Sequence, residues 1–81
     1  MSDLPNIVML KDYGKIRLDL KEMLDSRGIS RYSLARSIDV RFEVIKKWYD
    51  GDVAKMDLDV LARICYVLGC EPGDLLKREK L

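Results

Sequence analysis

The chain has 81 residues, of which 48% are hydrophobic and 36% are charged, and its formal net charge is +1. These values exclude a disordered tail, and the near-neutral charge gives no overall signal for a nucleic-acid partner. One domain of this length can bury only a modest core, so a dimer or another partner would stabilise it.

Residue types that carry catalysis or bind metals are scarce. The chain has no histidine and only two cysteines, Cys65 and Cys70, whose spacing matches no zinc motif and cannot build a disulfide framework. No nucleophile motif and no phosphate-binding loop occur. We therefore expect no enzyme, no cofactor and no metal. We expect Cys65 to be a buried, reduced thiol, which suits the cytoplasm.

No targeting or membrane signal is visible. No apolar run approaches the ~20 residues of a membrane-spanning helix, and no signal peptide is recognisable. The sequence therefore predicts a soluble cytoplasmic protein without a membrane partner. We divide it into an N-terminal segment (1–14), one domain (15–77) and a short tail (78–81).

The N-terminal segment contains one apolar run, Ile7-Val8-Met9-Leu10, which follows Pro5 and precedes the turn-like Asp12-Tyr13-Gly14. This pattern favours a short strand or a dimerisation arm. An unpaired apolar strand associates readily, so it should pair with residues 76–81 or with its copy in a second subunit. A frayed terminus is the alternative.

Five helices joined by short loops are predicted, which together form a compact all-α bundle. The second begins after the N-cap Ser30, the third ends at Gly51, the fourth follows the N-cap Asp57, and Glu71-Pro72 opens a short fifth. The first is expected over residues 15–27, where four apolar side chains share one face and Gly28 follows: Ile16, Leu20, Met23 and Leu24.

The second and third helices are separated only by a tight corner at Asp39-Val40. Leu34 and Ile38 form an apolar stripe before the corner, and Ile45, Trp48 and Tyr49 form another after it. A short turn between two helices at a steep angle is how a helix-turn-helix presents its second helix to the major groove of DNA. We therefore interpret residues 30–51 as a candidate helix-turn-helix.

The side chains of the third helix outside this stripe suit base recognition. Arginine and lysine can donate to guanine, glutamate can accept from cytosine, and phenylalanine can touch a thymine methyl. The alternatives are an ordinary solvent-facing surface and, for the phenylalanine, a partly buried position. Between residues 27 and 55, seven cations stand against four acids, so the basic excess lies over this helix pair. The candidate base-contacting residues are Arg41, Phe42, Glu43, Lys46 and Lys47.

The fourth helix is apolar almost all round, and such a helix is normally covered on both sides. The second side could lie under the fifth helix, under the N-terminal run or in a dimer interface. We favour a twofold dimer, which would set two recognition helices about 34 Å apart and match a palindromic site. One stripe, assigned to the core, contains Leu58, Leu61, Ala62, Cys65 and Leu68. The expected dimer interface combines the other stripe with the N-terminal run: Val60, Ile64, Val67, Ile7, Val8 and Met9.

These motifs together resemble the Cro and phage-repressor helix-turn-helix family, also called XRE-type, over about residues 15–77. The matches are a small residue in the second helix, a hydrophobe after the corner, two apolar residues in the third helix and the pattern from Asp57 to Gly69. The resemblance implies a lambda-repressor-like fold and a sequence-specific DNA-binding transcriptional regulator, a repressor-like homodimer of bacterial or phage type. The matching residues are Ala35, Val40, Ile45 and Trp48.

The resemblance also implies residue roles. Arg31 takes the place of a phosphate-contacting residue, with Ser30, Arg36 and Lys55 as further backbone contacts. The corner carries Asp39 where the family has glycine, and Arg41 is a poor N-cap. An antitoxin-like or accessory module that binds a protein partner through the fourth helix or the N-terminal segment is the alternative function.

Overall fold

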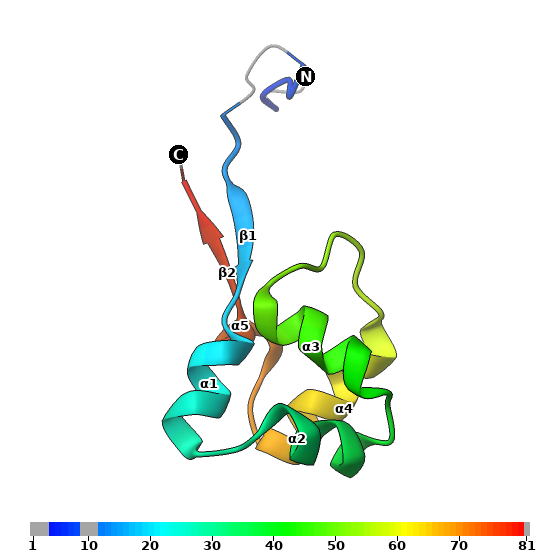
Figure 1. The fold of residues 1–81 in the computed structure, drawn as a ribbon. Coiled ribbons are helices and arrows are strands. Elements are labelled where there is room, and N and C mark those ends of the chain that lie inside the picture. The colour runs from blue at the N-terminus through cyan, green and yellow to red at the C-terminus, as the bar shows by residue number, and fades with distance from the viewer. Residues whose placement is uncertain (1–3, 9–11, 81) are drawn as a thin grey trace.

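The computed structural model describes residues 4–8 and 12–80. Within this part of the chain the helices gather into one body, and a two-stranded sheet projects from it beside α5 (Figure 1). The predicted mostly helical fold is therefore confirmed, with a small sheet added. In chain order the elements are β1 (Lys15–Leu18), α1 (Leu20–Arg27), α2 (Arg31–Ile38), α3 (Phe42–Asp50), α4 (Leu58–Leu68), α5 (Pro72–Leu75) and β2 (Leu76–Glu79).

The predicted N-caps are confirmed by their hydrogen bonds. The Ser30 hydroxyl accepts from the Ser33 N–H at 3.0 Å, and one Asp57 carboxylate oxygen accepts from the Asp59 and Val60 N–H groups at 2.8 and 3.3 Å. These bonds satisfy amide donors that have no partner inside the helix. The predicted C-terminal glycines also hold: α1, α3 and α4 end on Gly28, Gly51 and Gly69 in the left-handed conformation.

The predicted start of the first helix is wrong. Residues 15–18 form β1, which pairs antiparallel with β2 from Lys15 opposite Glu79 to Leu18 opposite Leu76. Ile16 is consequently 63% exposed instead of lying on the core face. The pattern of apolar residues over only four positions cannot distinguish a strand from a helical turn. Here the C-terminal segment provides the hydrogen-bonding partners of a strand.

The predicted strand at Ile7–Leu10 is misplaced. Ile7 and Val8 lie in an exposed turn, while Met9 and Leu10 are outside the described residues. Its predicted partner, the C-terminal tail, does form a strand, but with β1. Gly14 permits this pairing, because its φ is +81° and a Cβ there would overlap the Glu79 carbonyl oxygen.

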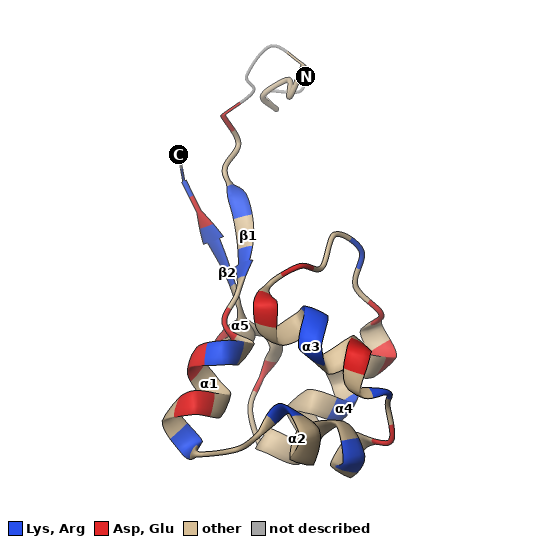
Figure 2. Ribbon diagram, in the orientation of Figure 1, with Lys and Arg blue, Asp and Glu red and all other residues tan. Residues whose placement is uncertain are grey.

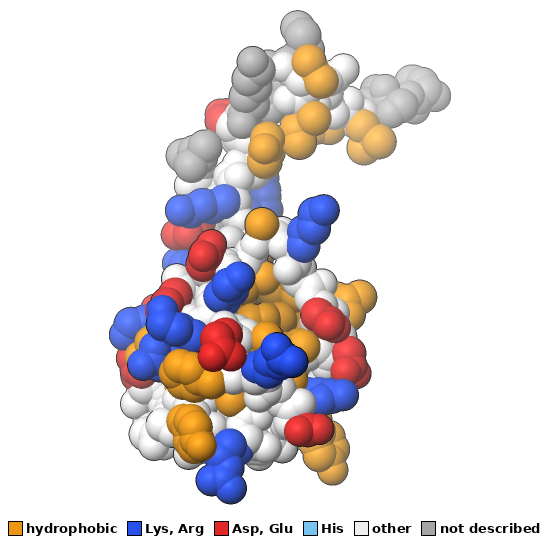
Figure 3. Space-filling view, turned by 45° about the vertical axis from the view of Figure 1, so that its right-hand side comes forward, with side chains coloured by type: hydrophobic (Ala, Val, Ile, Leu, Met, Phe, Trp, Pro, Cys, Tyr) orange, Lys and Arg blue, Asp and Glu red, His pale blue; other side chains and the backbone are white. Residues whose placement is uncertain are grey.

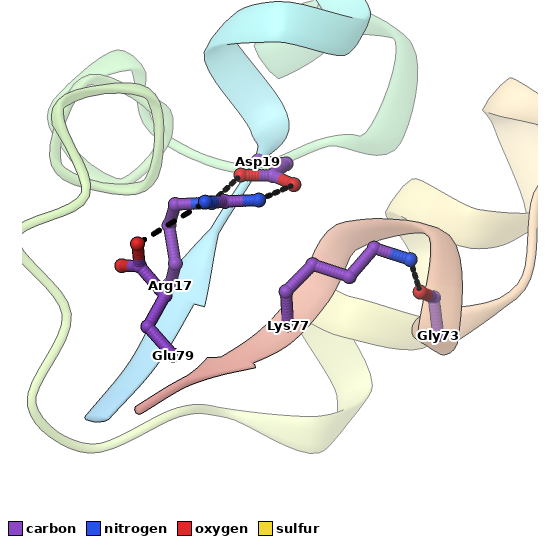
Figure 4. A network of polar contacts seen from close by, with 5 residues as sticks. All are labelled: Arg17, Asp19, Gly73, Lys77 and Glu79. Atoms are coloured by element: carbon purple, nitrogen blue, oxygen red, sulfur yellow. Dashed lines mark hydrogen bonds and ion pairs between the residues drawn. The ribbon is translucent and has the colours of Figure 1, made fainter. Parts of the chain in front are cut away.

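Ion pairs reinforce the two strands (Figure 4). The Arg17 guanidinium forms ion pairs with Asp19, the N-cap of α1, at 2.6 Å and with Glu79 on β2 at 3.2 Å. Lys77 donates to the Gly73 carbonyl at 2.5 Å. The Arg17 hydrogen bond lowers the pKa of Asp19. The ionised Asp19 therefore stabilises the folded protein fully above the ordinary aspartate pKa, and this stabilisation disappears as the pH falls through the lowered pKa.

The core takes in most, but not all, of both apolar stripes of α4. Val60 and Ile64, assigned above to a dimer interface, are 8% and 0% exposed within a single chain, whereas Val67 is 42% exposed. Two members of the predicted core stripe face solvent instead, since Leu58 is 74% exposed and Ala62 is also exposed. The buried set is Leu20, Leu24, Leu34, Ala35, Ile38, Ile45, Trp48, Val60, Leu61, Ile64, Cys65, Leu68 and Leu75.

Both cysteines are free, and Cys65 is buried as predicted. Burial raises the pKa of the Cys65 thiol to about 11, so it is protonated at neutral pH. Across the described residues, none of the helices has the length and hydropathy needed to cross a membrane.

Candidate nucleic-acid interface

The corner between α2 and α3 is fixed by backbone hydrogen bonds and by α4. Asp39 ends α2 with φ +58°, the positive φ predicted for this position. The Val40 N–H donates to the Ala35 carbonyl at 3.1 Å. From α4, the Arg63 guanidinium donates to the carbonyls of Ile38 and Asp39 at 3.0 and 3.3 Å. The angle between α2 and α3 is therefore fixed both by a backbone hydrogen bond within the corner and by a side chain of α4.

We expect Asp39→Gly to raise the free energy of unfolding by about 0.5–1 kcal/mol, because glycine adopts positive φ without the steric cost that a Cβ imposes. The Arg63 bonds go to backbone oxygens and survive the change. Thermal unfolding should show a midpoint higher by about 2–8 °C. The control is Asp52→Gly, at an exposed position without positive φ. A midpoint that rises equally in both variants would contradict this explanation.

Helix α3 turns one face to the core and the other to solvent. Ile45 and Trp48 are buried, and Phe42, Val44 and Tyr49 are half-buried beside them. Figure 2 shows both basic and acidic residues on the ribbon of α3. The exposed residues of α3 and its N-cap are Arg41, Glu43, Lys46, Lys47 and Asp50, which include four of the five predicted base-contacting residues.

The cations on this face differ in their partners. Lys46 forms an ion pair with Asp50 at 3.2 Å, one helical turn further along. Among the described residues, no carboxylate pairs with Lys47 or with Arg41. Arg41 also lacks a side-chain capping bond at the start of α3, as predicted. Lys47 and Lys55 line one hollow between α3 and the following loop.

The remaining predicted contact residues lie along α2 and at the start of α3. The Ser30 hydroxyl is occupied as the N-cap of α2 and also donates to the Ser33 hydroxyl. Arg36 lies over the Tyr32 ring at 5.9 Å. Phe42 is half-buried, as the alternative interpretation allowed, with its ring 6.3 Å from that of Tyr32. Arg31 is half-buried as well.

Sequence reasoning placed Tyr49 in the apolar stripe of α3 but missed Tyr32 and the contacts that both tyrosines make on this surface. Tyr32 lies between Arg36 and Phe42, and Tyr49 contacts α1 and the start of α2. The spacing of Phe42 and Tyr49, seven residues apart on one side of α3, was the available signal. Their partners come from other helices, which no spacing along the chain specifies.

Two helices across a fixed corner, the second with a charged outer face, define a helix-turn-helix DNA-binding domain. Residues 19–80 match the family model of the Cro/C1-type HTH DNA-binding domain. The chain therefore belongs to this family, also called XRE, which comprises DNA-binding regulators and not enzymes. The family resemblance drawn from the sequence is confirmed.

A solved structure supports the fold assignment. The crystal structure of the transcriptional regulator VanUg (form II) matches with a TM-score of 0.64 and 24% sequence identity, covering 84% of this chain and 91% of that chain. At this identity the similarity establishes the fold alone, and it confirms the lambda-repressor-like architecture. No curated protein matches the sequence.

Proposed function

We propose that this protein is a sequence-specific transcriptional regulator that acts in the cytoplasm as a repressor-like homodimer on a palindromic operator. The observation that carries the proposal is the outer face of α3, where Arg41 and Lys47 are exposed and have no acidic partner in the described structure. Exposed cations on a recognition helix can bind phosphates or donate to guanine.

Roles can be proposed for the surrounding residues. Arg41, Phe42, Glu43, Lys46 and Lys47 would contact bases. The phosphate contacts would come from Arg31 and Arg36 on α2, Lys55 in the loop after α3, and Ser30 through its backbone, since its hydroxyl caps α2. Phosphate contacts supply most of the affinity and position the domain, while base contacts supply specificity.

The homodimer is supported by exposed apolar side chains outside the helical body. Ile7 and Val8 are 58% and 73% exposed. Figure 3 shows hydrophobic side chains gathered on the projecting N-terminal part. Val67 on α4 is the third exposed member of the predicted interface. Because Val60 and Ile64 belong to the core, the proposed interface consists of the N-terminal segment and Val67.

Selection of random DNA duplexes by the purified protein, at two salt concentrations, tests the proposal. We expect a palindromic motif with half-sites one helical turn apart, and an affinity that falls steeply as salt rises. Sedimentation at micromolar concentration, with and without the selected DNA, should give a dimer. Enrichment of no sequence would reject operator binding, and a monomer both free and on DNA would reject the homodimer.

One observation favours a second candidate function. Tyr66 is 87% exposed on α4 and lies with Val67 beside a hollow between α2 and α4. An antitoxin-like or accessory module would bind a protein partner there. This function predicts a heterodimer whose formation is abolished by Val67→Asp, with no selection of DNA duplexes.

We expect Asp50→Asn to strengthen DNA binding about two- to fivefold. The change removes a negative charge from the DNA-facing side of α3 and releases Lys46 from its ion pair. Loss of an exposed pair at this spacing should lower the free energy of unfolding by only about 0.3–0.5 kcal/mol. Fluorescence anisotropy with the selected duplex measures the affinity. Asp59→Asn breaks the equivalent pair with Arg63 on α4 and is the control; equal gains in both variants would contradict the explanation.

A further inference from the structure

The guanidinium of Arg31 lies between two aromatic rings of α3. Its central carbon is 5.5 Å from the centre of the Phe42 ring and 5.0 Å from that of Tyr49. Both distances are within the range of cation–π attraction. Arg31 is the first residue of α2, so these contacts tie the start of α2 to the side of α3.

Tyr49 is itself anchored to α1. Its hydroxyl donates to one Asp25 carboxylate oxygen at 2.7 Å, and Lys21 pairs with the other oxygen at 2.8 Å. The Lys21 ammonium also lies 5.3 Å from the centre of the Tyr49 ring. The Lys21 and Tyr49 hydrogen bonds lower the pKa of Asp25 and so stabilise the ionised form of this acceptor. Two side chains of α1 thus hold the ring of α3 that supports Arg31.

The polar edge of Arg31 remains available. Within the described residues, its guanidinium forms no hydrogen bond and no ion pair. The Asp25 carboxylate attracts it from beyond ion-pair distance, and its five N–H donors lie in the plane of the guanidinium. Stacking on a ring engages the face of a guanidinium and leaves these donors in the plane. A free arginine would have to give up its conformational freedom on binding, whereas this one is held before any ligand arrives.

We propose that Phe42 and Tyr49 are positioning residues, which hold the Arg31 guanidinium ready to bind a DNA phosphate, and that Asp25 and Lys21 hold Tyr49. The inference rests on the proposed DNA-binding function. It adds to the phosphate contact of Arg31 a set of residues that orient its guanidinium. Because Phe42 and Tyr49 belong to α3, the phosphate bound by Arg31 sets the register of the recognition helix on the duplex.

A double-mutant cycle tests this inference, with affinity measured on the selected duplex at several salt concentrations. Arg31→Ala should reduce the dependence of log affinity on log salt by about 0.9, the value for one phosphate contact. Tyr49→Leu should weaken binding about two- to fivefold, the effect of one exposed cation–π contact. It should also move the salt slope toward that of Arg31→Ala. In the Arg31→Ala background, Tyr49→Leu should have no further effect.

Control variants separate positioning from folding. Tyr49→Phe keeps the ring and removes the bond to Asp25, so its loss of affinity should be smaller than that of Tyr49→Leu. Tyr66→Leu removes an exposed tyrosine from α4 and should change neither affinity nor slope. If Tyr49→Leu does not fold, Tyr49→Phe replaces it in the cycle. Tyr49→Phe should then also have no effect on affinity in the Arg31→Ala background.

The outcomes distinguish this inference from the proposed function. If the unmodified protein selects no DNA, the proposed function fails first. If it binds its operator but the Tyr49 and Arg31 effects add fully, or the salt slope stays unchanged in Tyr49→Leu, the positioning role is rejected while the function stands. Loss of additivity together with the reduced slope supports it.

Discussion

Replacing Ile64 with alanine should lower the free energy of unfolding by about 2–5 kcal/mol, the range for truncating a large buried aliphatic side chain. Ile64 is fully buried in the middle of α4, among residues contributed by the other helices. Small domains have only about 5–15 kcal/mol of stability in total. The expected loss is therefore a large share, and thermal or urea unfolding should show it at every protein concentration.

The matched control for this prediction is Val67→Ala, on the same helix. Val67 is 42% exposed, so its truncation should change monomer stability by about 0.5 kcal/mol or less. If Val67 contributes to the proposed dimer, its variant should instead dissociate at higher protein concentration in sedimentation. An Ile64→Ala protein as stable as the original would show that the core assignment of α4 is wrong.

Replacing Lys47 with alanine should weaken binding to the selected operator by about 1–3 kcal/mol, roughly five- to 150-fold, and relax discrimination at one base pair. Lys47 is exposed on the outer face of α3, and no described carboxylate engages it, unlike Lys46. Its ammonium is therefore free to donate to a base edge. Affinity for the operator and for its single-base variants, measured by anisotropy, gives both quantities.

The control for Lys47 is Lys80→Ala, which removes an exposed lysine beyond the end of β2. It should leave operator discrimination unchanged. If Lys47→Ala weakens operator and unrelated DNA equally, Lys47 contacts phosphate instead of a base. If it weakens neither, the base-reading role proposed for this residue is wrong.

The sequence alone predicted the helix-turn-helix and the helix boundaries, except for the start of the first helix. Ser30 and Asp57 cap helices through their own side chains, and Gly28, Gly51 and Gly69 end them, because these effects act within one helical turn. The spacing of apolar residues likewise predicted which face of α3 lies in the core. Local chemistry therefore determined the order of the helices and placed the charged face of the recognition helix outward.

Only the tertiary structure decided the features that join distant segments. Residues 15–18 became a strand because residues 76–79 lie beside them. Val60 and Ile64 are buried because the surrounding helices cover part of each apolar stripe of α4. The support of Arg31 by Phe42 and Tyr49 likewise depends on helices meeting in space. A side chain's spacing shows which face it occupies, but the element that covers that face is set by how the whole chain packs.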